Sequence, residues 1–149
     1  MIDLVIFDWK RTLYDPDSKV LIDGARKLLN FLKSKNLLII LIGKGGEDMN
    51  DEVKRLSVED YFKEIVFAQG EKDPNIFAKY ISKDEPKDTV LVGDRVRSEL
   101  EIGNKLGAMT LWVKQGKFAS EEPENKEQVP DYTVPNLSEC QQLLKKILV

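Results

Sequence analysis

The chain has 149 residues, of which 33% are charged, and its formal net charge is −3 at pH 7. This length suits a single domain, residues 1–149, that buries about 68–70% of the surface of its unfolded chain. Acidic and basic residues are interspersed, so neither nucleic acid nor an anionic membrane is expected as a partner. The absence of histidine excludes Ser-His-Asp triads and histidine-bound zinc, which leaves carboxylates, lysines and hydroxyls for any chemistry.

The single cysteine, Cys140, cannot form a disulfide within the chain, which is typical of proteins from a reducing compartment. We therefore expect a cytoplasmic location. Cys140 lies in a predicted amphipathic helix, and we interpret it as a packed thiol rather than a nucleophile. No apolar run approaches the roughly 18 residues of a membrane span, and the chain enters a strand at once, so neither a membrane segment nor a signal peptide is expected.

Short apolar runs alternate with amphipathic patterns along the chain. Strands are predicted at Leu4–Phe7, Leu37–Ile42, Ile65–Phe67, Thr89–Val92 and Met109–Val113. Helices are predicted at Ile22–Lys33, Asp48–Leu56, Pro74–Ile81, Val96–Leu106 and Leu137–Leu148. This alternation favours an α/β fold with a doubly wound parallel sheet and right-handed crossovers. The segment Gly116–Val134, rich in Glu, Lys, Asn and Pro, is expected to be a mobile loop.

Two of the predicted strands are each followed by an aspartate. Asp8 follows the run Leu4–Phe7, and Asp94 follows the run Val90–Gly93. A buried parallel strand is a continuous apolar run, and open α/β sheets place their chemistry at the carboxyl ends of their strands. The sequence therefore predicts that two carboxylates meet at this edge of the sheet.

These two segments resemble known motifs. Asp8 to Leu13 (DWKRTL) resembles the DxDGTL motif of the haloacid dehalogenase-like (HAD) superfamily of phosphohydrolases, and Gly93-Asp94 with Glu99 resembles its GDxxxxD motif. The resemblance covers nearly the whole chain and implies a Rossmann-like three-layer α/β/α sandwich with a five-stranded parallel sheet. Tyr14–Ile22 and Gly43–Gly70, where the family inserts cap domains, are short, so a member without a cap domain is expected.

The resemblance assigns roles to four of these residues. Asp8 would be the nucleophile that becomes an aspartyl phosphate, within a motif that also includes Thr12. Asp8, Asp94 and the main-chain carbonyl of Lys10 would bind Mg²⁺, which prefers a few carboxylates together with water and phosphate oxygens. Glu99 stands where the family has a second acid, and it is either a metal ligand or an ion-paired helix residue.

Lys10 departs from the family, whose phosphatases carry a second aspartate there. That aspartate protonates the leaving group and then activates water, and such acid–base groups contribute about 10²–10⁴ in rate. A lysine near Asp8, Asp94 and Glu99 stays an ammonium, which can act as an electrostatic partner or a weak acid but not as the base. It would relieve the repulsion between the carboxylates in place of Mg²⁺; the alternative is a lysine that points to solvent.

The second and third motifs depart as well. Ile42 stands where the family has a hydroxyl that holds the phosphate. Gly43 and Lys44, with the two glycines that follow, either present main-chain N–H groups to a phosphate or form a plain turn. Glu71 stands at the register of the lysine that balances the nucleophile. Either Lys72 is shifted by one place, or Lys10 or Lys44 supplies that charge.

Three hypotheses for the function follow. The first is a Mg²⁺-dependent phosphohydrolase that acts through Asp8 and is attenuated by Lys10. The alternative is a catalytically degenerate HAD-like domain that binds a phosphorylated ligand or a protein. The third is a phosphoenzyme switch in which Asp8 is phosphorylated but hydrolysis is slow. A site without a cap implies a phosphorylated macromolecular substrate, a small substrate covered by another subunit of an oligomer, or no catalysis.

Overall fold

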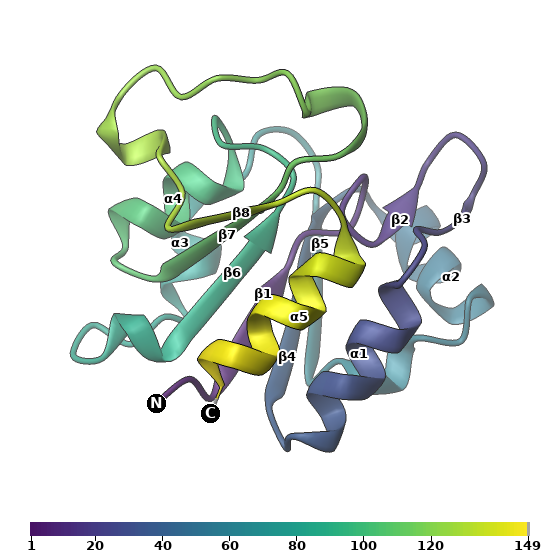
Figure 1. Cartoon of the computed structure of the whole chain (residues 1–149). Helices are drawn as coiled ribbons and strands as arrows, with labels where there is room; N and C mark the ends of the chain where they lie inside the picture. Colours follow the sequence, from purple (N-terminus) through teal and green to yellow (C-terminus); the bar gives the residue numbers. More distant parts are fainter. Residues whose placement is uncertain (149) are drawn as a thin grey trace.

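Strand β1 (Leu4–Phe7) lies inside the sheet because all four of its side chains are apolar and buried. In the computed structural model, which describes residues 1–148, six parallel strands form one sheet in the order β5-β4-β1-β6-β7-β8 (Figure 1). The other strands are β4 (Leu38–Lys44), β5 (Glu64–Ala68), β6 (Thr89–Gly93), β7 (Met109–Val113) and β8 (Tyr132–Val134). The α/β fold predicted from the sequence is confirmed.

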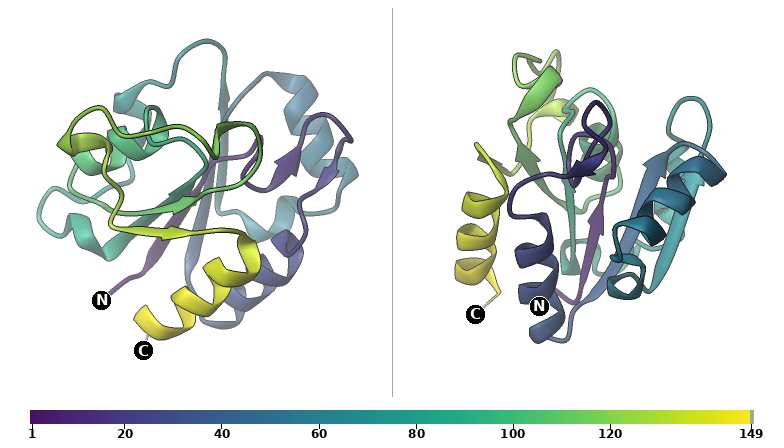
Figure 2. Two further views of the ribbon diagram at one scale, coloured as in Figure 1. Left: turned by 45° about the horizontal axis from the view of Figure 1, so that its top comes forward. Right: turned by 90° about the vertical axis from the view of Figure 1, so that its right-hand side faces the viewer.

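Helices cover both faces of the sheet. On one face lie α1 (Ala25–Ser34), α2 (Glu47–Arg55) and α5 (Leu137–Ile147). On the other lie α3 (Pro74–Ala78) and α4 (Glu99–Lys105). Helices α1 and α5 pack side by side, as both views of Figure 2 show. None of the helices within residues 1–148 is long and apolar enough to cross a membrane.

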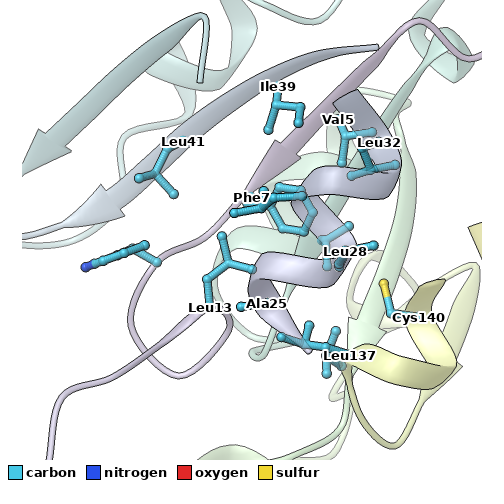
Figure 3. Close-up of a cluster of buried hydrophobic side chains, with 14 of the residues drawn as sticks. Val5, Phe7, Leu13, Ala25, Leu28, Leu32, Ile39, Leu41, Leu137 and Cys140 are labelled. Carbon is cyan, nitrogen blue, oxygen red and sulfur yellow. The ribbon is translucent and has the colours of Figure 1, made fainter. Parts of the chain in front are cut away.

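The side chains of β1 alternate between the two faces. Val5 and Phe7 enter the cluster beneath α1, whereas Leu4 and Ile6 enter the cluster beneath α3 and α4. Figure 3 shows the first cluster, in which Phe7 lies among residues of α1, β4 and α5. Each such side chain contributes about 1.5–3 kcal/mol on burial. The strand is therefore held firmly on both faces, which fixes the position of the residue that follows it.

Cys140 belongs to this first cluster and is fully buried (Figure 3). Burial raises the pKa of its thiol to about 12. A buried thiol that stays protonated is a poor nucleophile, which agrees with its interpretation as a packed residue.

The expectation of five strands was wrong by one. Residues 132–134 form β8, which pairs in parallel with β7 through Leu111↔Tyr132 and Val113↔Val134. The strand is only three residues long and exposes Thr133, so it lacks the apolar run that marks the other strands. The segment expected to be a mobile loop therefore ends in a strand.

Residues 114–131, which join β7 to β8 and include the rest of that segment, are called the strap here. It contains two 3-10 turns, Gly116–Phe118 and Lys126–Gln128, and arches over the ends of β6 and β7 (Figure 1). The Asn104 side-chain amide donates to the carbonyls of Glu127 at 2.7 Å and Val129 at 2.9 Å. The strap is thus fastened to α4 instead of extending into solvent.

Two segments at which the family inserts caps are short here. Between β1 and α1 lies an antiparallel hairpin of β2 (Tyr14–Asp15) and β3 (Val20–Leu21), which we call the flap. Between β4 and β6 lie only α2, the turn Glu59–Tyr61, β5, α3 and the turn Pro86–Asp88. The predicted helices are confirmed but begin later in two cases, because Gly24 adopts a φ of 90° before α1 and residues 95–98 form a turn before α4.

Candidate active site

The carboxylates of Asp8 and Asp94 lie together at the carboxyl edge of the sheet, as predicted. Strands β1 and β6 are neighbours in register, and the N–H of Asp8 donates to the carbonyl of Val92 at 3.1 Å. The hydroxyl of Thr12 lies 3.2 Å from Asp8 Oδ2 and 3.3 Å from Asp94 Oδ1. All three side chains are buried. The two motifs therefore build one site.

A tight turn after β1 returns Thr12 to Asp8. The carbonyl of Trp9 accepts N–H bonds from Thr12 at 3.2 Å and Tyr14 at 3.0 Å. The Trp9 ring stacks on the Tyr14 ring, with centroids 5.0 Å apart and planes 6° from parallel. Arg11, within the turn, adopts a left-handed conformation with φ of 65°. The turn is therefore fixed by main-chain bonds and by aromatic packing.

Lys72 supplies the positive charge of the site. Its ammonium donates to Asp8 Oδ1 at 2.6 Å and to Glu99 Oε1 at 2.9 Å. Burial alone would lower the pKa of Lys72, but the two carboxylates outweigh it and raise the pKa above its ordinary value. Among the alternatives for the third motif, the structure brings Lys72 to Asp8, one place beyond Glu71, which is exposed.

Glu99, the first residue of α4, is engaged at both carboxylate oxygens. Oε2 accepts the N–H groups of Asp94 at 3.0 Å and Arg95 at 2.9 Å, while Oε1 binds Lys72. The side chain reaches back over Gly93, where any Cβ atom would collide with the Glu99 carboxylate. The ion pair is therefore present, and the other role of Glu99, as a metal ligand, stays a prediction.

Asp94 retains one unused oxygen. Its Oδ2 is buried and has no hydrogen-bond partner within residues 1–148, although its main-chain carbonyl accepts Trp112 Nε1 at 2.9 Å. Burial, followed by the charges of Asp8 and Glu99, raises the pKa of Asp94 well above the usual range. An orphaned buried carboxylate oxygen is costly, and a bound cation would satisfy it. Asp8, Asp94 and Glu99 each offer an oxygen within 4.8 Å of the others, so the donor set fits Mg²⁺.

Lys10 does not bridge the two aspartates. Its side chain is half-buried and takes part in no hydrogen bond or ion pair within the described residues 1–148. The expectation that its ammonium relieves the carboxylate repulsion was therefore wrong, because Lys72 reaches that place from another loop. The expected role of the Lys10 main-chain carbonyl as a metal ligand stays a prediction.

Residues 43–46, called the glycine loop here, were a candidate phosphate cradle. The N–H of Gly45 donates to the carbonyl of Ala68 at 3.0 Å, and the N–H of Gly46 donates to Asp48 Oδ1 at 3.1 Å. Both donors are used within the protein, so the structure favours the plain turn over an anion cradle. Lys44 is exposed and has no ionic partner in the part of the chain that the structure describes.

Gly43, which lies near the end of β4, leaves no room for a side chain. A Cβ atom there would lie 2.8 Å from both Phe67 Cε1 and Trp9 Cβ. The preceding Ile42 is buried in the cluster beneath α3 and α4. Neither residue presents a polar side chain to the site, in contrast with the hydroxyl that the family places here.

Sequence reasoning missed several neighbours of the site. Trp112 in β7 pairs with Gly93 in β6, and its indole reaches the main-chain carbonyl of Asp94. Its place near the end of a predicted strand could have indicated that it lies at the same edge of the sheet as Asp94. Gln115 donates from the strap to the carbonyls of Arg11 at 3.2 Å and Thr12 at 3.3 Å. No local pattern marks Gln115, since the contact joins opposite ends of the chain.

Comparisons with known proteins agree with this architecture. The family model described as HAD-hydrolase-like matches residues 69–140. A glyceraldehyde 3-phosphate phosphatase from Pyrococcus furiosus is 30% identical over 132 residues, which are 84% of this chain and 55% of that protein. The chain thus spans about half the length of the curated relatives it matches.

Solved structures show the same fold. A putative β-phosphoglucomutase from Thermotoga maritima superposes with a TM-score of 0.75 at 17% identity, covering 98% of this chain and 100% of that one. A putative HAD-hydrolase from Bacillus subtilis, bound to magnesium, superposes with a TM-score of 0.68 at 20% identity over 85% of this chain and 57% of that one. The two motifs, the family match and the Pyrococcus relative together support membership of the haloacid dehalogenase-like superfamily, and the solved structures show its fold.

Proposed function

We propose that the chain is a Mg²⁺-dependent phosphohydrolase of phosphate monoesters that acts through Asp8 and is slowed by Lys10. The observation that carries this proposal is the ion-paired Asp8 beside Asp94, whose second oxygen is buried without a partner. A buried carboxylate oxygen without a partner destabilises the folded chain. A bound cation and phosphate would offset this cost, and such costly arrangements are typical of active sites. The Pyrococcus relative, named for a small phosphate monoester, supports the class of substrate.

In the first step a carboxylate oxygen of Asp8 forms a bond to phosphorus, and the bond from phosphorus to the ester oxygen breaks. The departing oxygen then takes up a proton. The ammonium of Lys72, 2.6 Å from Asp8, balances charge at the nucleophile, while Thr12 orients Asp8 through its hydroxyl. When bound by Asp8, Asp94 and the Lys10 carbonyl, Mg²⁺ would supply the positive charge that lets a carboxylate approach a phosphate.

In the second step water attacks phosphorus, the bond to Asp8 breaks, and phosphate leaves with the carboxylate regenerated. Position 10 has no carboxylate to accept the proton of water. A group of that kind is worth about 10²–10⁴ in rate, so the phosphorylated Asp8 is long-lived relative to family members with the second aspartate. The alternative of a degenerate binding domain would leave Asp8 unphosphorylated.

We further propose that residues 1–148 act without a cap domain. Only the flap and a helix-strand segment stand at the two points of cap insertion, so substrate reaches the edge of the sheet directly. Such a site accepts a phosphorylated group on a macromolecule, or a small molecule covered by a second subunit.

The test is hydrolysis of an aryl phosphate, whose good leaving group needs little protonation, with and without Mg²⁺. We expect slow, Mg²⁺-dependent turnover that Asp8→Asn reduces to background, because an amide is not a nucleophile. Asp3→Asn, the same change before β1, is the matched control and should leave turnover unchanged. Activity that survives Asp8→Asn, or no turnover at all, would contradict the proposal.

A further inference from the structure

Arg11 stands where the family motif has glycine, and its backbone shows why glycine suits that place. Its φ of 65° lies in the left-handed region, which is disfavoured for a residue with a Cβ atom. The carbonyl of Arg11 is held in this conformation by Gln115 Nε2 at 3.2 Å. The chain thus keeps a long cationic side chain three residues after the nucleophile, at a position where its conformation is unfavourable.

The Arg11 guanidinium lies over an aromatic ring that the strap supplies. Its Cζ is 5.8 Å from the centroid of Phe118, and the Cζ of Arg95 is 4.1 Å from the same centroid. Arg11 belongs to the loop that supplies Asp8, and Arg95 directly follows Asp94. Phe118 therefore lies between the two loops that carry the site, where the strap arches over the edge of the sheet (Figure 2).

The charges around Phe118 are not balanced. Arg95 forms an ion pair with Glu121 at 2.9 Å, but neither Arg11 nor Lys117, whose Nζ is 5.4 Å from the ring centroid, forms an ion pair within residues 1–148. On the flap, Asp15 accepts from Ser18 Oγ at 2.7 Å, and this bond, more than the charge of Arg11, lowers the pKa of Asp15. Unpaired cations thus gather at the site although the whole chain carries a net charge of −3.

We propose that Arg11, which lies over the Phe118 ring together with Arg95, forms a subsite for a second anionic group of the substrate. The preferred substrates are then small phosphate monoesters that also carry a carboxylate or a second phosphate. A guanidinium suits this role because its planar fork matches either anion with two parallel hydrogen bonds, and the cation–π contact with Phe118 favours its position beside the ring. The inference rests on the proposed phosphohydrolase function and names its substrate class.

The first test compares two substrates of similar size, 3-phosphoglycerate and glycerol 3-phosphate, which differ in the carboxylate. We expect wild-type kcat/KM to favour 3-phosphoglycerate by roughly 10- to 100-fold, the range of a charged hydrogen-bonded pair. Arg11→Gly, which restores the glycine of the family motif and suits the left-handed φ, should remove this preference, and Arg11→Lys should keep part of it. Lys19→Gly is the matched control, a cation with φ of 59° on the flap, and should keep the full preference.

The second test needs no catalysis. Titration calorimetry in the presence of Mg²⁺ should show that the wild-type chain binds 3-phosphonopropionate roughly 10- to 100-fold more tightly than propylphosphonate. Arg11→Gly and Phe118→Leu should each reduce that ratio, Phe118→Leu less. Equal affinities in the wild type, or binding of neither phosphonate, would overturn the inference.

The two tests separate the two proposals. Hydrolysis of both substrates with no preference would overturn the Arg11 subsite and leave the phosphohydrolase standing. A clear preference in binding without hydrolysis of either substrate would overturn the phosphohydrolase and keep Arg11 as a ligand-binding residue.

Discussion

Two regions on either side of β1 differ sharply in what they offer a phosphate. Toward β6, Asp8, Thr12, Asp94, Glu99 and Lys72 form a buried network, called the charged cluster here, in which one oxygen of Asp94 is left for a ligand. Toward β4, the only side chain of the glycine loop is the exposed Lys44, and the N–H groups of Gly45 and Gly46 are bonded within the protein. The carboxylates and the lysine that the proposed attack on phosphorus needs are therefore present. In these two regions, few hydroxyl or N–H groups are free to bind the phosphate.

This contrast has a simple energetic reason. A buried charge is costly unless it has a partner, and in the charged cluster Lys72 pairs with both Asp8 and Glu99. The glycine loop carries no buried charge, and its main-chain donors find neutral or surface partners in Ala68 and Asp48. The four changes below test the contrast, from the largest expected effect to the smallest.

Lys72→Met should destabilise the protein by about 3–5 kcal/mol, because it leaves Asp8 and Glu99 buried without their shared cation. Thermal or urea unfolding measures the loss, and Mg²⁺ should restore more stability to this variant than to the wild type. Lys83→Met, at an exposed position, is the control and should change little. A Lys72→Met protein as stable as the wild type would mean that the charged cluster does not hold the site together.

Lys10→Asp restores the second aspartate of the first motif. Because it adds the missing acid–base group, it should raise turnover of an aryl phosphate by up to about 10²–10⁴ and shorten the life of the phosphorylated Asp8. Lys44→Asp, an exposed lysine of the glycine loop, is the control and should give no gain. A folded Lys10→Asp variant that binds Mg²⁺ without any gain would favour the degenerate binding domain.

Gly43→Ala should destabilise the protein by about 1–3 kcal/mol, since its Cβ atom would lie 2.8 Å from Phe67 and from Trp9. Gly46→Ala is the matched change in the same loop, where a Cβ atom would lie 2.9 Å from the mobile end of the Gln69 side chain, and it should cost less. Urea unfolding of both variants measures the difference. Equal free energies of unfolding for the two variants would show that Gly43 is not tightly packed against Trp9 and Phe67.

Glu52→Gln tests how α2 holds the flap, and its effect should be the smallest. Arg55 and the hydroxyl of Tyr14, 2.6 Å from Glu52 Oε1, lower the pKa of Glu52 to about 2. Since the folded pKa is below the unfolded one, the stability gained from the Glu52 carboxylate is present above about pH 4.5 and lost as the pH falls toward about 2.

The difference in melting temperature between wild type and Glu52→Gln should therefore shrink as the pH falls through this window. Glu47→Gln, exposed on the same helix, is the control. If the difference in melting temperature does not change with pH, the Glu52 carboxylate is not ionised in its contacts with Tyr14 and Arg55.

Much of the charged cluster could be predicted from the sequence, because its members lie at strand ends or at fixed spacings. Asp8 and Asp94 directly follow the apolar runs of two strands, β1 and β6, that pair in parallel, so their carboxylates lie close together. Thr12 follows Asp8 by four residues, within the turn after β1.

The sequence left three lysines, Lys10, Lys44 and Lys72, as candidates for the positive charge beside Asp8. A local sequence pattern does not show how far a loop places its side chains from the sheet, so it could not choose among them. The pairing of Lys10 with the aspartates was wrong for the same reason, as the cation came from a loop distant in sequence.

Outside that cluster the sequence was less informative. Strand β8 has three residues and one exposed side chain, so no periodicity marked it. The sequence left both a plain turn and an anion cradle open for the glycine loop, with the turn preferred, and the partners of its N–H groups favour the turn. The stacking of Arg11 on Phe118 joins distant segments and depends on tertiary packing alone.

The central claim is that Asp8 becomes phosphorylated and that Lys10 leaves the phosphoenzyme long-lived. It is tested most directly by quenching turnover of an aryl phosphate with Mg²⁺ in acid, followed by digestion and mass spectrometry. We predict that the peptide containing Asp8 gains the mass of one phosphoryl group in the wild type, much less in Lys10→Asp, and none in Asp8→Asn. Turnover without this phosphopeptide, or with the phosphoryl group on another residue, would contradict the account.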